Sequence, residues 1–293
     1  MNSSPLDFRS LLAAAGYISD ERLALALNLA VRLERPLLLE GNAGVGKTFV
    51  AQALAEVLDR PLIRLQCYEG LDVNHAIYEW NYQRQMLAVA RAAHTAGDRD
   101  DDRDLFSEAF LIRRPLLEAI SQESPPVLLI DELDRADEEF EAFLLEMLAE
   151  YQITIPEIGK VSATSKPLTI ITSNGVRDLS DALRRRCLFH HIDFPDPATE
   201  LRIIQARVPD CSVRLAQTVA SFVAALRQED LEKTPGIAET LDWVAALIGL
   251  GVEDIHSDLR AVHASLLCVL KTEADQALVD LPRFERLAAQ AIP

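Results

Sequence analysis

Two kinds of hydrophobic pattern alternate along the first two thirds of the chain. Continuous apolar runs are typical of strands that are buried on both faces of a parallel sheet, whereas apolar residues three or four apart predict amphipathic helices. The runs that predict strands lie at residues 37–40, 61–65, 126–130, 168–172 and 189–192; the run at 126–130 is apolar throughout, whereas the others include polar residues. Because helical patterns separate these runs, we predict a doubly wound α/β domain.

Helical periodicity occupies most of the sequence between the apolar runs. The predicted helices cover residues 6–33, with a break near Gly16, and then 47–58, about 85–94, about 106–123 and about 137–150. Two short apolar segments at 153–155 and 161–163 flank Gly159 and predict a hairpin. The charge-rich segment 97–104 predicts a solvated loop.

Beyond residue 194 the pattern is helical throughout. The turn-forming sequence Phe194-Pro195-Asp196-Pro197 marks the change. The helices predicted after it lie at about 197–207, 212–228, 237–250, 257–270 and 282–291. We therefore expect an α/β domain with a short helical N-terminal segment at residues 1–194, followed by a small all-helical domain at residues 195–293.

An unbroken G-x-x-x-x-G-K-[ST] motif follows the first predicted strand and opens a predicted helix. It comprises Gly41, Asn42, Ala43, Gly44, Val45, Gly46, Lys47 and Thr48. Glycines let the backbone approach an anion, and the N–H groups at the start of the helix point at it. Lys47 would place a positive charge against the outer phosphates, and the Thr48 hydroxyl would reach Mg²⁺. This context favours binding of ATP with Mg²⁺ over a glycine-rich turn without a ligand.

Two acids follow the apolar run at 126–130. Asp131 and Glu132 end a predicted strand, and ligands bind at the carboxyl ends of the strands in such a fold. Asp131 can hold the Mg²⁺ shell, and Glu132 can orient or deprotonate the water that attacks the γ-phosphorus. The alternative is a pair of acids that only favours the start of a helix. The adjacent glutamate points to hydrolysis of ATP to ADP and phosphate, because a phosphotransferase does not activate water.

Polar groups also follow the next predicted strand. Ser173-Asn174-Gly175 reads as a turn when taken alone. At the tip of the strand beside the acidic one, Asn174 could contact both the γ-phosphate and the attacking water. Its place in the chain resembles sensor 1 of the AAA+ ATPases.

Three consecutive arginines close the α/β region, at Arg184, Arg185 and Arg186. Their simplest role is a favourable interaction with a helix dipole. In a ring ATPase, an arginine here would instead neutralise transition-state charge in the neighbouring subunit's site. Similarity to the arginine-finger segment of AAA+ proteins favours Arg186, with Arg185 or Arg184 as substitutes.

With these elements in order, the chain resembles the MoxR branch of the AAA+ ATPases over nearly its whole length. Within it, the chain looks most like the accessory ATPase of aerobic carbon monoxide dehydrogenase and related molybdenum hydroxylases. The segments that carry this narrower resemblance are Leu65–Asp72, Tyr78–Tyr82, Phe110–Leu116 and Gly236–Trp243.

The resemblance implies an AAA+ P-loop NTPase core followed by a helical lid domain. It also implies a homo-oligomeric ring, expected to be a hexamer, that works with a von Willebrand factor A-domain protein. Such a pair would remodel or mature a client metalloenzyme, for instance by helping to insert or activate its metal cofactor.

Two segments bear on the mechanism that the resemblance implies. Many AAA+ lids place a sensor-2 arginine at the start of the third lid helix, but residues 235–240 contain no arginine, and Lys233 is the nearest base. Tyr68-Glu69-Gly70 follows the second strand, where many AAA+ rings carry a pore loop that grips polypeptide. Local packing of Tyr68, or a place in the subunit interface, is the alternative.

Composition and charge limit the kinds of partner and the cellular location that we expect for this protein. The formal net charge of −17 disfavours nucleic acid as a partner, because it repels phosphate backbones. No apolar run is long enough to span a bilayer, and the N-terminus lacks the pattern of a signal peptide. The scattered cysteines at 67, 187, 211 and 268 are typical of a reduced cytoplasmic protein, and the histidines have no metal-like spacing.

Three other functions share these motifs. A DNA-handling AAA+ motor is disfavoured by the charge and by the absence of an aromatic and basic groove pattern. A small-molecule kinase is disfavoured by the acidic pair, by Asn174 and by the helical tail. The sequence does not separate a nucleotide-gated scaffold from an ATP-hydrolysing chaperone.

Overall fold

The computed structural model describes residues 6–94 and 105–291, so the loop expected at 97–104 lies outside the described residues. Its contacts divide the chain into two compact units. The sheet unit contains Leu25–Glu40 and Leu54–His190, and the helical unit contains Asp7–Ala24, Gly41–Ala53 and the chain from His191 onward. Neither unit is continuous in sequence. The expected domain boundary after residue 194 therefore stays a prediction.

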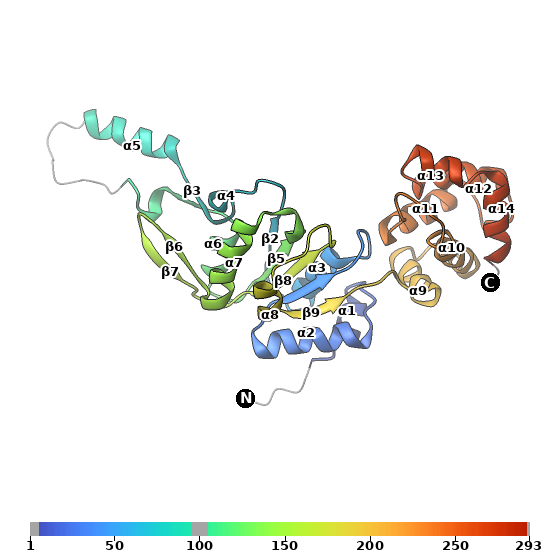
Figure 1. Cartoon of the computed structure of the whole chain (residues 1–293), viewed down its shortest axis with the longest axis horizontal. Helices are drawn as coiled ribbons and strands as arrows, with labels where there is room; N and C mark the ends of the chain where they lie inside the picture. The colour runs from blue at the N-terminus through green and yellow to red at the C-terminus, as the bar shows by residue number, and fades with distance from the viewer. Residues whose placement is uncertain (1–5, 95–104, 292–293) are drawn as a thin grey trace. The chain divides into compact units, whose positions relative to one another are not determined.

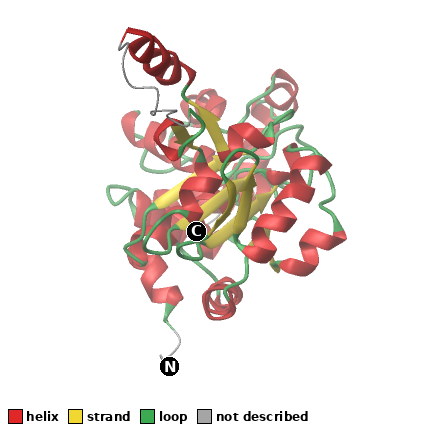
Figure 2. Cartoon of the chain, turned by 90° about the vertical axis from the view of Figure 1, so that its left-hand side faces the viewer, coloured by secondary structure: helices red, strands yellow, loops and turns green. Residues whose placement is uncertain are grey.

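A five-stranded sheet organises the sheet unit (Figure 1). In spatial order its strands are β2 (Leu62–Gln66), β5 (Val127–Asp131), β8 (Leu168–Ser173), β1 (Leu37–Glu40) and β9 (Leu188–His191). The registers of β2 with β5, β5 with β8, and β8 with β1 are parallel. Every residue of the central strands β5 and β8 is buried. The continuous apolar run at 126–130 predicts this for β5, whereas β8 also buries Thr169, Thr172 and Ser173. Figure 2 shows these strands lying side by side.

Helices separate the strands in sequence, and local capping fixes several of their starts. The N-terminal helices are α1 (Phe8–Ala14), α2 (Glu21–Leu33), α3 (Lys47–Val57) and α4 (Val73–Ile77). The later ones are α5 (Tyr82–His94), α6 (Pro115–Ile120), α7 (Glu138–Glu150) and α8 (Asp181–Arg186), with a 3₁₀ turn, η2 (Leu133–Arg135). The side chains of Asp137 and Ser180 accept hydrogen bonds from the first turns of α7 and α8, which satisfies free N–H groups there.

The long helix predicted at about 106–123 is wrong. That segment forms a 3₁₀ turn, η1 (Glu108–Phe110), a strand, β4 (Leu111–Arg113), and the short helix α6. Strand β4 pairs antiparallel with β3 (Tyr78–Trp80). Trp80 stacks edge-on against Phe106, with ring centroids 5.2 Å apart, so long-range pairing overrides the local helical periodicity. Pro115 then starts α6 at a position where a helix tolerates proline.

The predicted hairpin is confirmed. Strands β6 (Gln152–Ile155) and β7 (Gly159–Ser162) pair antiparallel, and Gly159 adopts a positive φ of 93° next to the turn. Its register places Ile153 opposite Val161.

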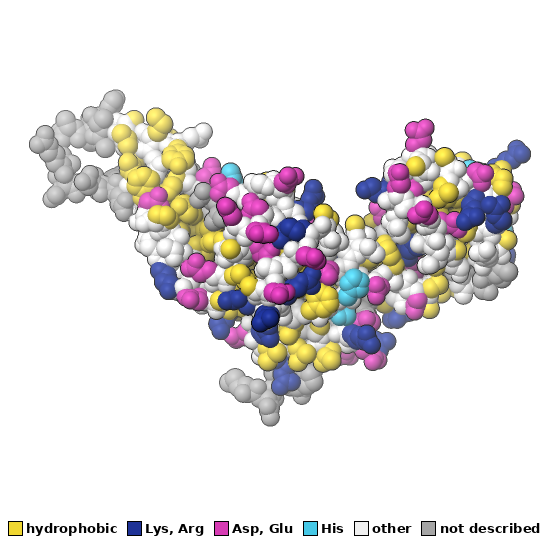
Figure 3. All heavy atoms as spheres, in the orientation of Figure 1, with side chains coloured by type: hydrophobic (Ala, Val, Ile, Leu, Met, Phe, Trp, Pro, Cys, Tyr) yellow, Lys and Arg dark blue, Asp and Glu magenta, His cyan; other side chains and the backbone are white. Residues whose placement is uncertain are grey.

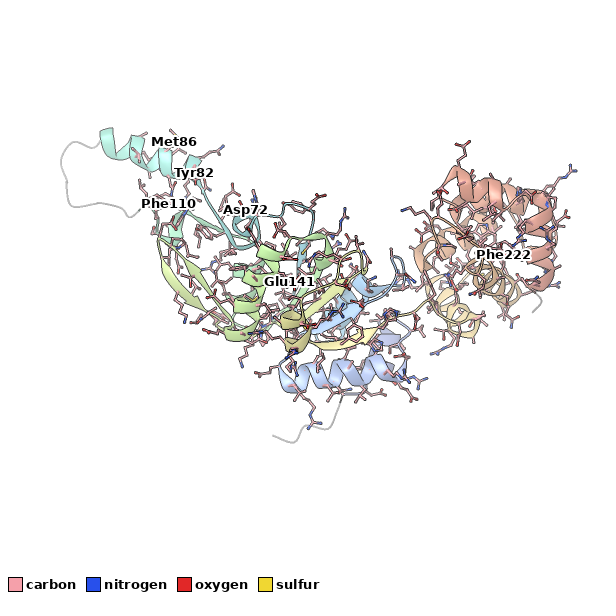
Figure 4. The ribbon with its side chains drawn as sticks, viewed as in Figure 1. Asp72, Tyr82, Met86, Phe110, Glu141 and Phe222 are labelled. Carbon is pink, nitrogen blue, oxygen red and sulfur yellow. The ribbon has the colours of Figure 1, made fainter. Side chains whose placement is uncertain are left out.

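The helices after residue 196 enclose a core of their own. They are α9 (Pro197–Arg207), α10 (Val213–Leu226), α11 (Ile237–Gly249), α12 (Leu259–Ser265), α13 (Glu273–Leu278) and α14 (Leu281–Gln290), with the turn η3 (Leu266–Cys268). Phe222 lies at the centre of this core, and its ring centroid is 5.3 Å from those of Trp243 and Phe284 (Figure 4). The predicted helix at about 257–270 ends earlier, as α12 and η3, and α13 was not predicted.

Candidate nucleotide site

The carboxyl ends of three neighbouring strands carry the predicted site residues. Strand β1 ends at Glu40 and leads directly into the loop that starts at Gly41. Strand β5 ends at Asp131, and β8 ends at Ser173, next to Asn174. Because β5, β8 and β1 are adjacent and parallel, their carboxyl ends share one edge of the sheet.

The loop from Gly41 to Gly46 lies so close to a neighbouring backbone segment that side chains would not fit at some of its positions. A side-chain carbon at Gly41 would lie 2.1 Å from the carbonyl oxygen of Ile192, so only glycine fits there. Lys47 begins α3 and is 6% exposed, and its ammonium donates to the carbonyl oxygens of Gly41 and Asn42 at 2.8 and 2.7 Å. The lysine charge is therefore held within the loop. This arrangement fits a phosphate group, since the same ammonium and the N–H groups at the start of α3 can face an anion.

Asp131 is buried and held by two donors. The Thr172 hydroxyl donates to Asp131 Oδ1 at 2.6 Å, and Arg64 Nη2 lies 2.5 Å from Asp131 Oδ2. The burial of this carboxylate is tolerable because both of its oxygens have polar partners. An oxygen ligand fixed in this way is the kind that Mg²⁺ prefers, so the residue fits its predicted metal-binding role.

Glu132 occupies an unusual backbone conformation. Its φ of 55° and ψ of 50° place it in the left-handed region, which costs a non-glycine residue energy. Its N–H donates to the Thr172 hydroxyl at 2.8 Å, which anchors the turn after β5. Its Oε2 accepts from Gln66 Nε2 and from Arg135 Nη1, both at 3.1 Å. The predicted base is thus partly exposed but held by neighbours on β2 and η2.

A third acid organises the loop of Asn174. Asp134 Oδ2 accepts from the backbone N–H groups of Asn174 and Val176 at 3.1 and 2.9 Å. Asp134 is 3% exposed, and it connects the turn after β5 to the loop after β8. The acidic segment and the Asn174 loop are therefore brought together, as their places on adjacent strands predict.

Glu141 on α7 links the loop after β8 to the start of α8, the helix that carries the three arginines. Its side chain is 2% exposed, lies 3.0 Å from Arg177 Nη1 and accepts from the Ser180 N–H at 2.7 Å. Arg177 Nη2 also donates to the carbonyl of Ala136 at 3.0 Å. Since Ser180 caps α8, one buried carboxylate on α7 fixes the start of the helix that carries the three arginines.

The three arginines have different surroundings. Arg184 Nη2 lies 2.7 Å from Glu40 Oε2, and its guanidinium lies over the Phe189 ring. Arg185 and Arg186 are exposed, and their backbone carbonyls accept hydrogen bonds from Arg35. The end of α8 is therefore fixed to the chain before β1, while two of its guanidinium groups lie at the surface.

Burial and the acidic surroundings also affect a thiol beside the site. Burial, reinforced by the negative charges of Asp131, Asp134 and Glu132, raises the pKa of Cys67 to about 12. Its N–H donates to the Asp131 carbonyl at 2.8 Å. Cys67 is therefore a protonated, unreactive part of the core at neutral pH.

Several residues of the site were not predicted from the sequence, namely Arg64, Gln66, Asp134, Glu141, Thr172 and Arg177. The signal available for Thr172 was a polar residue at the end of a predicted buried strand, and the polar alternation of β2 was the signal for Arg64 and Gln66. Asp134 and Glu141 look like ordinary surface acids in the sequence. Only tertiary contacts distinguish them.

These features define a protein of the P-loop α/β class, with polar groups gathered where the parallel strands end. A family model described as an AAA domain of the dynein-related subfamily matches residues 36–187, more than half of the chain, and the chain belongs to this family. The family match confirms the predicted fold and the resemblance to AAA proteins. The family match and the ATPase names of relatives support the prediction that the chain hydrolyses ATP.

Similar curated proteins include two gas vesicle ATPases. GvpN2 of Halobacterium salinarum is 29% identical over 217 residues, which cover 70% of this chain and 60% of that protein. GvpN of Haloferax mediterranei is 26% identical over 204 residues, 66% of this chain and 57% of that protein. An uncharacterized protein of Staphylococcus epidermidis is 24% identical over 256 residues, 85% of this chain and 89% of that protein. The chain thus spans less than two thirds of the two gas vesicle ATPases.

Within residues 6–94 and 105–291, no helix is both long enough and apolar enough to cross a membrane.

Proposed function

We propose that this chain is a Mg²⁺-dependent AAA+ ATPase that uses ATP hydrolysis to remodel a protein client. The loop from Gly41 to Gly46, with Lys47, binds the phosphates. Thr48 and Asp131 hold Mg²⁺, which would neutralise charge on the phosphate oxygens. Glu132 activates the water, and Asn174 positions it. The motifs, and the sheet edge on which β1, β5 and β8 all end, support this assignment of roles.

The observation that carries the proposal is the arrangement around Thr172. One hydroxyl group donates to Asp131 and accepts from the Glu132 N–H, so it fixes the metal-binding candidate and the base candidate together. A pair of acids that only favoured the start of a helix would not need a buried partner on the next strand. Preorganised polar groups of this kind contribute strongly to catalysis.

We further propose that the chain works as a ring, for which six subunits are the expectation. Arg185 and Arg186 are exposed at the end of α8, so either can reach a neighbouring subunit. Arg184 already pairs with Glu40. The surroundings therefore favour Arg186 or Arg185 as the residue that completes the neighbour's site.

A client would meet apolar surface on the sheet unit. On α5, Tyr82, Met86 and Val89 are more than half exposed and recur at helical spacing (Figure 4). Apolar side chains gather over this helix in the space-filling view (Figure 3). Tyr68, after β2, is 47% exposed. Exposed apolar surface of this kind is typical of protein interaction sites.

The nature of the client is the part of the proposal that rests on similarity. The resemblance to the accessory ATPase of carbon monoxide dehydrogenase predicts a molybdenum hydroxylase as client and a von Willebrand A-domain partner. The names of the relatives connect two of them with gas vesicles. What the two cases share is an ATPase, and we propose that this chain directs its ATPase activity at another protein.

ATPase assays of two variants test the enzyme. Lys47→Ala should lose nucleotide binding, whereas Glu132→Gln should bind ATP but turn over at least about 100-fold more slowly, since it lacks the group that accepts the proton. Asp137→Asn, at an exposed helix cap, is the control. Turnover at the wild-type rate in Glu132→Gln would remove Glu132 from the proposed role.

Affinity purification from the native cell then tests the client. The Glu132→Gln protein held in ATP should retain a protein partner that the Lys47→Ala protein does not, as identified by mass spectrometry. A molybdenum hydroxylase with a von Willebrand A-domain protein would establish the narrower client. Recovery of nucleic acid, or of the chain alone, would contradict the remodelling proposal.

A further inference from the structure

The first N–H groups of a helix have no backbone acceptor within the helix, and those at the start of α11 find other acceptors. The Gly236 N–H donates to Glu239 Oε2 at 3.1 Å. The Ile237 N–H donates to the carbonyl oxygen of Gly44 at 2.9 Å. Gly44 belongs to the phosphate-loop motif, so this loop supplies the acceptor that the start of α11 requires. Both partners lie in the helical unit.

Two glycines make this contact possible. A side-chain carbon on Gly44 would lie 2.8 Å from the Cα of Gly236, and one on Gly236 would lie 2.6 Å from the Cα of Gly44. Gly44 also has a φ of +81°, which side-chain-bearing residues rarely adopt. The two backbones therefore touch directly, and no side chain separates them.

The residues before α11 are held firmly on their other side. Arg227 Nε donates to the carbonyl of Pro235 at 2.9 Å, and its guanidinium forms a bidentate pair with Glu200 at 2.6 and 2.8 Å. The Arg227 side chain is 4% exposed and that of Glu200 is fully buried. The Thr240 hydroxyl donates to Glu200 Oε1 at 2.9 Å. A buried, charge-assisted network of this kind positions its members closely.

We propose that α11 senses the occupancy of the phosphate loop through this backbone contact, with Glu239 and Arg227 as positioning residues. The inference rests on the proposed nucleotide function. A phosphate bound by the N–H groups of the loop selects one loop conformation. Because the Gly44 carbonyl belongs to the same loop, that selection changes how well the Ile237 N–H is satisfied.

Replacing Ile237 by proline breaks the contact, because it removes the N–H and places the ring Cδ where the hydrogen points at the Gly44 carbonyl oxygen. Proline removes the N–H but is favourable at the first position of a helix, and the extended backbone of Gly236 is compatible with a following proline. Ile237→Ala is the matched control, because it loses the side chain and keeps the N–H. We expect Ile237→Pro to weaken ATP binding about 3-fold to 10-fold relative to Ile237→Ala, as the loss of one hydrogen bond implies.

Hydrogen exchange in the full-length Glu132→Gln protein gives the second readout. Saturating ATP should slow amide exchange across α11 in the parent protein and in Ile237→Ala, whereas Ile237→Pro should bind ATP without this protection. A role confined to lid stability would lower protection equally with and without ATP. Equal ATP affinity and an unchanged α11 response in Ile237→Pro would overturn the inference.

A second variant keeps the test decisive. If Ile237→Pro does not fold, Gly236→Ala should separate the two backbones and give the same loss of the ATP response. Wild-type ATP affinity and an intact α11 response in Gly236→Ala would overturn the inference. If the parent protein itself binds no ATP, the proposed function fails, and the inference fails with it. If instead the parent protein binds ATP but amide exchange in α11 does not change, only the inference is overturned and the proposed function stands.

Discussion

Arg184 Nη2 lies 2.7 Å from Glu40 Oε2, so an arginine near the end of α8 is tied to the residue immediately before the phosphate loop. Both side chains are partly buried, at 32% and 21% exposed. An arginine held in this way stabilises its own subunit. The neighbouring Arg185 and Arg186 are exposed, so the three arginines, which are consecutive in the sequence, differ in what they can reach.

This difference predicts separate phenotypes for the arginines. Arg186→Ala should reduce ATP turnover by about 1,000-fold or more if it supplies transition-state charge in trans, with little change in Tm. Arg184→Ala should lower Tm, because Glu40 loses its partner. Steady-state ATPase assays and thermal unfolding measure the two effects, and Arg185→Ala tests the substitute position.

Mixing experiments provide the control for action in trans. Equimolar Arg186→Ala and Glu132→Gln proteins should recover activity that neither has alone, since a mixed assembly can combine an intact glutamate with a neighbour's intact arginine. Without such recovery in mixed assemblies, the assignment of Arg186 to the neighbour's site would not stand.

Removal of the Thr172 hydroxyl should raise the Mg²⁺ concentration that ATPase activity requires, without changing the shape of the core. Thr172→Val deprives Asp131 of a donor and the Glu132 N–H of its acceptor. Loss of a group that orients a metal ligand typically costs about 10-fold to 100-fold in metal affinity or activity. A Mg²⁺ titration of ATPase activity measures the change. Thr172→Ser, which keeps the hydroxyl, should behave much more like wild type, and equal behaviour of the two variants would contradict this role.

Glu141 should be important for stability although it looks like a surface acid. Glu141→Ala leaves Arg177 and the Ser180 N–H without their partner. Breaking one side of a fully buried ion pair costs about 3–5 kcal/mol, but the remaining Arg177 is 29% exposed, so the free energy of unfolding should fall by less, about 2 kcal/mol. Urea unfolding measures it. Glu146→Ala, at an exposed position on the same helix, should change it by less than about 0.5 kcal/mol.

The buried thiols predict a dependence on pH. Burial raises the pKa of both Cys67 and Cys187 to about 12 from an ordinary value of 9.0. The folded protein then holds protons that the unfolded chain releases, so stability should fall as pH rises from about 9 to about 12. At pH 8 both thiols should react with a disulfide reagent only on unfolding, whereas the partly exposed Cys268 reacts faster. Absorbance of the released thiolate in single-cysteine variants measures these rates, and rapid labelling of native Cys67 would contradict its burial.

The sequence by itself determined the elements whose pattern is local. The continuous apolar run at 126–130 and the largely apolar segment at 168–172 predicted the buried strands β5 and β8, because parallel strands are covered on both faces. The motif from Gly41 to Thr48 predicted a loop and the start of a helix, and α3 does begin at Lys47. Asp131 and Asn174 were predicted as site residues because polar residues at strand ends are visible in the sequence.

Tertiary structure decided what depends on partners distant in the chain. Residues 111–113 form a strand and not a helix, because β3 offers them a ladder. Glu141 and Asp134 become structural acids through contacts with residues about 40 positions away. The contact between Gly44 and Gly236 joins segments far apart in sequence, and neither glycine shows locally what it touches. Local sequence encodes hydrophobic period and backbone preference, whereas the partner of a buried polar group depends on where the fold brings distant residues.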